Sequence, residues 1–198
     1  FMQLEEGQII EPLNEEDRKV LSTADRWVLH ALERTINEVT GALERFDFAA
    51  AANGVYQFFW SYLCDWYIEL SKPALREPGP AADLTKKVLI HALDQALRLL
   101  HPFMPYLTEE LWTRLPMTHE FIAGSHDAGA AGHTICIASW PTASGLYTDH
   151  AAAALLDQQI AIIVAVRTIR GENRIAPKVA LPIIVSAPDE ATAALALA

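Results

Sequence analysis

Four polar residues that suit nucleic-acid contacts recur in the segment 22–45. They are Arg26, Arg34, Asn37 and Arg45. If the segment is a helix in which each residue advances by about 100°, all four project within about 100° of one another, opposite the apolar stripe. Arginine offers bidentate contacts to phosphate or guanine, and asparagine can read a base edge. Alternatively, these four residues are ordinary solvated side chains that pair with nearby glutamates. Their spacing alone does not decide between a nucleic-acid-binding role and this one.

Two aromatic residues of the next segment form a second candidate group. Phe58 and Tyr62 are expected to point away from the main apolar face, towards the side that bears Asp65 and Glu69. Outward aromatic rings can stack on unpaired bases. Packing against a neighbouring helix is the alternative role.

Further cations lie near predicted helix ends. Lys72 and Arg76 follow the second predicted helix, and Arg167, Arg170 and Arg174 are spaced by three and four residues near the end of the fifth. The arginine group is the densest positive patch in the sequence and would suit a phosphate backbone. Cations at a helix C-terminus are also stabilised by the helix dipole without any ligand.

The sequence lacks the motifs of an enzyme active site. It contains no G-x-x-x-x-G-K-[ST], G-x-G-x-x-G, G-x-S-x-G or H-E-x-x-H pattern. His119, His126 and His133 are seven residues apart, without the close pairs that metal sites use. We therefore predict neither a catalytic residue nor a metal site in this chain.

The elements that would position these residues are mostly helices. Ser22 and Asp25 have the spacing of a capping box, and apolar residues then recur every three or four positions up to residue 43. Further helices are predicted over about 49–71, 84–101 and 105–115. The inward face of the second is predicted to hold Tyr56, Phe59, Leu63, Trp66, Tyr67 and Leu70. Short connections between apolar-faced helices favour a mainly α fold, an antiparallel helical bundle.

The sequence after residue 116 has a different character. A glycine-rich loop is expected, with a short extended segment at 135–138, then a helix capped by Asp149, a strand at 181–185 and a helical start at 190–198. The predicted domains are an acidic connector (1–21), the helical bundle (22–116), the loop (117–148) and a helix-strand junction (149–198). We interpret the last part as a small truncated α/β junction.

Composition narrows the possible classes of function. The chain has 198 residues, of which 52% are apolar, and a formal net charge of −10. An apolar fraction this high excludes intrinsic disorder, and the acidic balance argues against a protein that coats nucleic acid non-specifically. The sequence has two cysteines, and we expect neither a membrane-spanning segment of about 20 apolar residues nor a secretory leader. The expectation is a cytoplasmic protein without a membrane partner.

Several motifs together resemble one family. Five runs of residues resemble segments of valyl-tRNA synthetases and occur in the same order. They are Asp25-Arg26-Trp27-Val28-Leu29, Cys64-Asp65-Trp66-Tyr67 through Lys72-Pro73, His101-Pro102-Phe103-Met104-Pro105 through Trp112, Ser139-Trp140-Pro141 and 165–177. The Cys-Asp-Trp-Tyr run favours a valyl enzyme over an isoleucyl or leucyl one. The similarity covers nearly the whole chain, although the loop 117–134 looks longer and richer in glycine than in the family.

The resemblance implies a function. The parent enzyme would use ATP and Mg²⁺ to attach valine to its tRNA, while this fragment would bind the anticodon stem-loop and no cofactor of its own. The nucleotide-binding signatures H-I-G-H and K-M-S-K-S do not occur in the sequence, so the catalytic domain of the same chain and a C-terminal arm are expected to lie elsewhere. Two alternatives to this function remain. The chain could be the same region of an isoleucyl- or leucyl-tRNA synthetase, or an independent helical module that binds protein.

Overall fold

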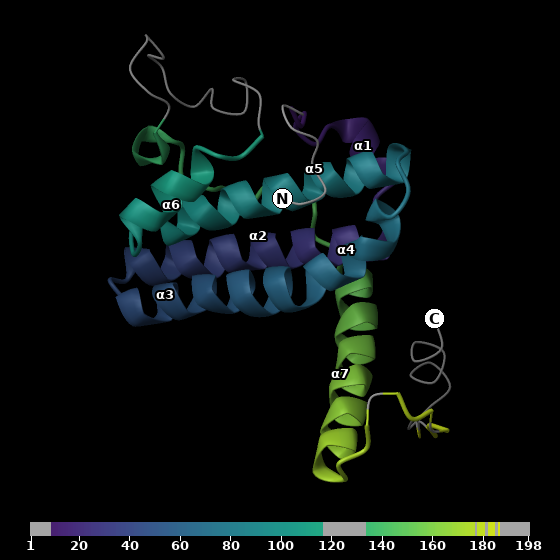
Figure 1. Cartoon of the computed structure of the whole chain (residues 1–198). Coiled ribbons are helices and arrows are strands. Elements are labelled where there is room, and N and C mark those ends of the chain that lie inside the picture. Colours follow the sequence, from purple (N-terminus) through teal and green to yellow (C-terminus); the bar gives the residue numbers. More distant parts are fainter. Residues whose placement is uncertain (1–8, 117–133, 177, 181, 185, 187–198) are drawn as a thin grey trace. The chain divides into compact units, whose positions relative to one another are not determined.

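The computed structural model describes residues 9–116, 134–176, 178–180, 182–184 and 186 (Figure 1). The chain divides into two compact units, residues 1–148 and residues 149–198. The glycine-rich part of the predicted loop and the predicted helical tail at 190–198 lie outside the described residues.

The first long helix begins where the capping box predicts. Helix α2 spans Thr23–Glu44 with Ser22 as its N-cap. The Ser22 Oγ accepts from the Asp25 backbone N–H at 3.2 Å, and the Asp25 carboxylate accepts from the Ser22 N–H at 3.1 Å. The predicted apolar stripe is buried, with Val28, Leu32 and Val39 no more than 2% exposed. The capping box thus gives partners to two of the backbone N–H groups that the start of a helix leaves without intrahelical bonds.

The second predicted helix is one continuous rod with two kinds of winding. Helix α3 (Phe48–Gln57) leads into the π-helix η1 (Phe58–Tyr67) and then into α4 (Ile68–Leu75), alongside α2 (Figure 1). A π-helix forms i→i+5 hydrogen bonds, so residues five apart come one above the other. Phe58 and Leu63 are five apart, and both are buried. Leu63 and Tyr67 of the predicted inward face are indeed buried, whereas the π-helical winding and the burial of Phe58 were not predicted.

Two further helices complete the bundle. Helix α5 spans Pro80–Leu100 and α6 spans Pro105–Trp112. Helix α5 begins four residues before the predicted start at residue 84. Its first residue is Pro80, at a position where proline loses no hydrogen bond. Helix α5 packs against α2, α4 and α6. The mainly α helical bundle is confirmed.

Close packing of α2 and α3 depends on one glycine. A Cβ atom built on Gly54 would lie 3.2 Å from the Val39 Cγ2 atom. The absence of a side chain at this position allows the two helices to approach.

Two short elements of the first unit differ from the sequence-based expectation. Residues of the predicted acidic connector form helix α1 (Glu15–Lys19), because Asn14 and Asp17 make a capping box there. The segment predicted as extended at 135–138 forms the 3₁₀ helix η3 (Ile135–Ile137), with the Thr134 side chain as its cap. In both cases a local side-chain cap decides the backbone conformation.

The second unit contains helix α7, His150–Glu172, with the predicted N-cap Asp149. Residues 182–184 are described and form no strand, whereas 181 and 185 lie outside the described residues. By length and composition alone, helix α7 is long and apolar enough to cross a membrane. Core helices of soluble proteins meet the same criterion, so this observation assigns no location.

Candidate nucleic-acid-binding surface

The polar row of α2 lies on the exposed side of the helix. Arg26, Arg34, Asn37 and Arg45 are all exposed, while the apolar stripe is buried. The helical spacing therefore gave the correct side of α2 for each of them. Arg26 Nη2 donates to the Thr23 hydroxyl at 3.4 Å, and the Arg45 guanidinium lies against Gly41 near the end of the helix.

Arg34 and Tyr62 are brought together from positions 28 residues apart. Arg34 Nη2 donates to the Tyr62 hydroxyl at 2.7 Å, and its guanidinium carbon lies 5.3 Å from the centre of the Tyr62 ring. The same ring packs on Trp27, with 5.2 Å between the ring centres. Tyr62 is therefore held between two residues of α2. It orients an arginine rather than presenting an open face to a base.

Phe58 is not available at the surface. Its side chain is 1% exposed and belongs to the core, contrary to the predicted outward orientation. Phe58 continues the buried face of α3, because it follows the buried residues Ala51 and Val55 at the α-helical spacing of four and three residues. In this structure Phe58 cannot stack on a base.

Two other aromatic pairs are exposed, and the sequence-based reasoning missed both. Phe46 and Phe48 are 79% and 59% exposed at the turn between α2 and α3, with 6.4 Å between their ring centres. Tyr56 and Trp60 are 57% and 53% exposed and stack with parallel rings. Tyr56 was predicted to face the core. The many aromatic residues in the segment 46–67 indicated that some of them could be exposed. Periodicity alone could not tell which aromatic side chains are exposed and which are buried.

The turn that carries Phe46 is well defined. Phe46 has a backbone φ of 59°, in the left-handed region, and Asp47 then caps α3 through a 3.0 Å bond from the Ala50 N–H. A non-glycine residue with positive φ is uncommon. This turn therefore brings Arg45, Phe46 and Phe48, three exposed residues close in sequence, to the end of α2 and the start of α3.

The remaining predicted cations have varied surroundings. Lys72 is exposed and pairs with Glu69, and Arg76 is exposed at the end of α4. In the second unit Arg170 donates to the backbone carbonyls of Ala176 and Val179, so it holds the chain that follows α7. Arg167 and Arg174 are exposed on the same unit.

Two buried carboxylates link separate segments of the first unit. Asp94 is fully buried and accepts hydrogen bonds from Arg98 Nε at 2.9 Å and Trp112 Nε1 at 2.6 Å. Glu33 is 5% exposed and accepts from the hydroxyls of Ser144 and Thr148. Glu33 thus holds the segment 144–148 against α2, instead of pairing with the arginine row.

Burial shifts the pKa of several groups. Burial, reinforced by the charge of Asp25 and its hydrogen bond, raises the pKa of Tyr67 well above its ordinary value. Burial lowers the pKa of His91, and Arg98 lowers it further, while Asp94 and Glu33 act in the opposite direction. Burial also raises the pKa values of Cys64 and Tyr147. The lowered pKa of His91 favours its neutral form.

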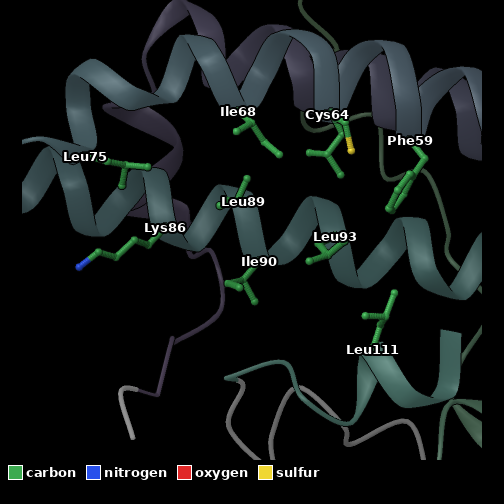
Figure 2. Close-up of a pocket in the computed structure, with 10 residues that line it drawn as sticks. Phe59, Cys64, Ile68, Leu75, Lys86, Leu89, Ile90, Leu93 and Leu111 are labelled. Atoms are coloured by element: carbon green, nitrogen blue, oxygen red, sulfur yellow. The ribbon is translucent and has the colours of Figure 1, made fainter. Parts of the chain in front are cut away.

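An apolar pocket of about 240 Å³ lies between the η1–α4 part of the rod and α5 (Figure 2). Its lining is Phe59, Leu63, Cys64, Ile68, Leu75, Lys86, Leu89, Ile90, Leu93 and Leu111. The Lys86 ammonium points away from the other lining side chains and pairs with Asp83. A binding pocket for a small polar ligand usually holds several convergent polar groups, and this lining is almost entirely apolar.

Comparisons with known proteins agree with this architecture. Residues 25–185 match the family model described as the anticodon-binding domain of tRNA ligase. The chain is 43% identical to a valine--tRNA ligase of Thermotoga maritima over 77% of its length and 40% identical to that of Pseudothermotoga lettingae over 85%. It is 38% identical to a valine--tRNA ligase of Bacillus cereus over 87% of its length.

The similar region is a small part of each relative. The chain spans 16%, 17% and 18% of the lengths of these three proteins, respectively. The family model, by contrast, covers most of the chain, including the bundle that bears the arginine row and the exposed aromatics. The chain therefore belongs to the family of anticodon-binding domains of tRNA ligases.

Proposed function

We propose that this chain is the anticodon-binding region of a valine--tRNA ligase and that it binds the anticodon stem-loop of the tRNA for valine. The observation that carries the proposal is the match of residues 25–185 to the anticodon-binding family, together with 38–43% identity to valine--tRNA ligases. In the parent protein ATP and Mg²⁺ would be used by a catalytic domain outside this sequence.

The exposed residues of the first unit suit such a ligand. Arg26, Arg34 and Arg45 would contact phosphates, which position an RNA without reading its sequence. The two exposed aromatic pairs would stack on unpaired anticodon bases. Asn37, Lys72, Arg76 and the arginines of the second unit remain further candidates for RNA contacts.

Arg34 has a defined place in this proposal. Its hydrogen bond to Tyr62 restricts the guanidinium before any ligand arrives, and its side chain is still 45% exposed. A restricted arginine loses less conformational entropy on binding than a mobile one. We propose that Tyr62 acts through Arg34, as a positioning residue.

Titration of the 198-residue chain with a fluorescent anticodon stem-loop tests the proposal. We expect saturable binding at low salt that weakens as salt rises, because phosphate contacts release counterions. Stem-loops that differ only in their anticodons for valine, isoleucine and leucine should bind with different affinities, the valine loop most tightly. Equal binding of all three and of a scrambled loop would contradict anticodon recognition by this region.

A further inference from the structure

Three side chains from separate elements of the first unit converge at one place. His101 follows the last residue of α5, Glu109 lies in α6 and Cys136 lies in η3. The ligand atoms of the three residues all lie within 4.8 Å of one another. The His101 Nε2 atom is 3.3 Å from the Cys136 Sγ atom, and Sγ is 4.0 Å from Glu109 Oε2.

The environment of His101 sets its tautomer. The Thr108 hydroxyl donates to the carbonyl of Met104 at 2.9 Å, so its oxygen can accept from the His101 Nδ1–H at 2.7 Å. Thr108 itself is completely buried. With the proton on Nδ1, the lone pair of Nε2 faces the Cys136 sulfur. A histidine metal ligand needs this arrangement, in which the second nitrogen donates to a fixed acceptor.

The carboxylate of Glu109 is also held in place. Its Oε2 atom accepts from the Thr134 hydroxyl at 2.8 Å and from the Ile135 N–H at 3.2 Å. These bonds join α6 to η3 and so determine where Cys136 lies. Cys136 is exposed, which leaves a route for an ion from solvent.

We propose that His101, Glu109 and Cys136 form a Zn²⁺ site. Nitrogen, thiolate and carboxylate are the ligands that zinc takes in proteins, at about 2.0–2.3 Å. Ligands at such distances around a tetrahedral ion lie roughly 3.3–3.8 Å apart, so small side-chain rotations would close the site. The Cys136 thiol proton passes to solvent as the ion binds. The two negative ligands balance the charge of the ion, and water takes the fourth position.

Sequence spacing could not reveal this cluster. Its members are separated by 8 and 27 residues, whereas the histidine and cysteine pairs of familiar zinc motifs lie within a few residues of one another. The fold alone brings them together. A bound ion would tie the end of α5, α6 and η3 to one another, and would thereby stabilise the folded state.

The test uses the untagged, metal-free 198-residue chain. Calorimetric titration should show one Zn²⁺ per chain, and Co²⁺ in its place should give the thiolate-to-metal absorption band. Cys136→Ser should abolish the band and weaken Zn²⁺ binding at least tenfold. Thr108→Val, which removes the hydrogen-bond partner of His101 without replacing a proposed ligand, should weaken binding by about 10–100-fold. The melting temperature of the wild type should rise with Zn²⁺, and that of Cys136→Ser should not.

Two matched controls keep the test decisive. Cys64→Ser removes the other cysteine of the chain, and His119→Asn, His126→Asn and His133→Asn together remove the histidines of the loop. Both variants should bind Zn²⁺ as the wild type does. Absence of saturable binding to the wild type, undiminished binding to Cys136→Ser, or loss of binding in the triple histidine variant would each overturn the proposal. Circular dichroism checks that every variant is folded.

Discussion

The Tyr67 hydroxyl donates a 2.6 Å hydrogen bond to the Oδ1 atom of Asp25, 42 residues earlier in the chain. Both residues are at most 2% exposed. The other oxygen of this carboxylate accepts from the Ser22 backbone and hydroxyl. One buried side chain thus both caps α2 and joins its beginning to the end of the π-helix. Burial and the charge of Asp25 raise the pKa of Tyr67 above its ordinary value, so the donor proton is retained to higher pH than in a free tyrosine.

Tyr67→Phe should destabilise the protein by about 1.5–3 kcal/mol, because a buried carboxylate loses a hydrogen-bond donor. Urea unfolding followed by circular dichroism measures the change. The control is Tyr106→Phe, since Tyr106 is 92% exposed, and its effect should stay within about 0.5 kcal/mol. Equal effects of the two substitutions would show that the Tyr67–Asp25 bond contributes nothing.

Asp94→Asn should cost more, about 3–5 kcal/mol, because it leaves the largely buried Arg98 without its charged partner. Trp112 Nε1 also loses the charged acceptor of its hydrogen bond. The matched control is Glu110→Gln, which breaks the exposed pair of Glu110 with Arg114 and should cost no more than about 1 kcal/mol. A small effect at residue 94 would contradict a structural role for the buried pair.

The pH dependence of stability should include a contribution from His91, whose ring centre lies 6.0 Å from that of Tyr147. Its pKa is lowered in the folded state, so below about pH 6.5 the unfolded chain binds this proton more readily than the folded one. Stability should therefore decrease as pH falls below about 6.5. His91→Gln should reduce the difference between urea midpoints measured above and below this pH. His150→Gln, at an exposed position, should leave the difference unchanged.

Trp60→Ala should weaken stem-loop binding by about 1–3 kcal/mol, the usual contribution of stacking on one base. The same change at the 92% exposed Tyr106 removes an aromatic ring from α6 and should leave affinity unchanged. Equal losses would indicate non-specific contacts with aromatic rings.

Arg45→Gln should weaken binding to all stem-loops alike and lower the salt slope by about one. The measurement is the dependence of log affinity on log salt concentration, compared with wild type. A change in anticodon preference without a change in slope would show that Arg45 contacts a base and not a phosphate.

Local signals predicted the helices well but not the winding of one of them. The capping residues Ser22 and Asp149 gave the starts of α2 and α7, because a cap acts through neighbouring residues only. The π-helix has no such local signal in the sequence. Separately, the faces assigned to Phe58 and to Tyr56, which lies in the regular helix α3, were wrong, and the two exposed aromatic pairs were missed.

Contacts between residues far apart in the sequence could not be predicted either. Nothing in the spacing of Arg34 and Tyr62, or of Glu33 and Ser144, indicates that they meet. Which polar residue is paired and which is exposed depends on such tertiary contacts. The arginine row was placed on the correct side of α2, and the alternative of pairing with a nearby glutamate holds for Arg34, whose Nε atom lies 3.7 Å from Glu38 Oε1. The contact of Arg34 with Tyr62 was not predicted.

The π-helix also limits how the exposed aromatics can be transplanted or redesigned. Tyr56 and Trp60 lie on either side of the junction where α-helical winding ends and π-helical winding begins. On a regular α-helix the residues after position 57 would project at different angles around the helix axis. A different set of aromatic rings would then face solvent. Copying this surface onto another scaffold requires copying its backbone winding together with its side chains.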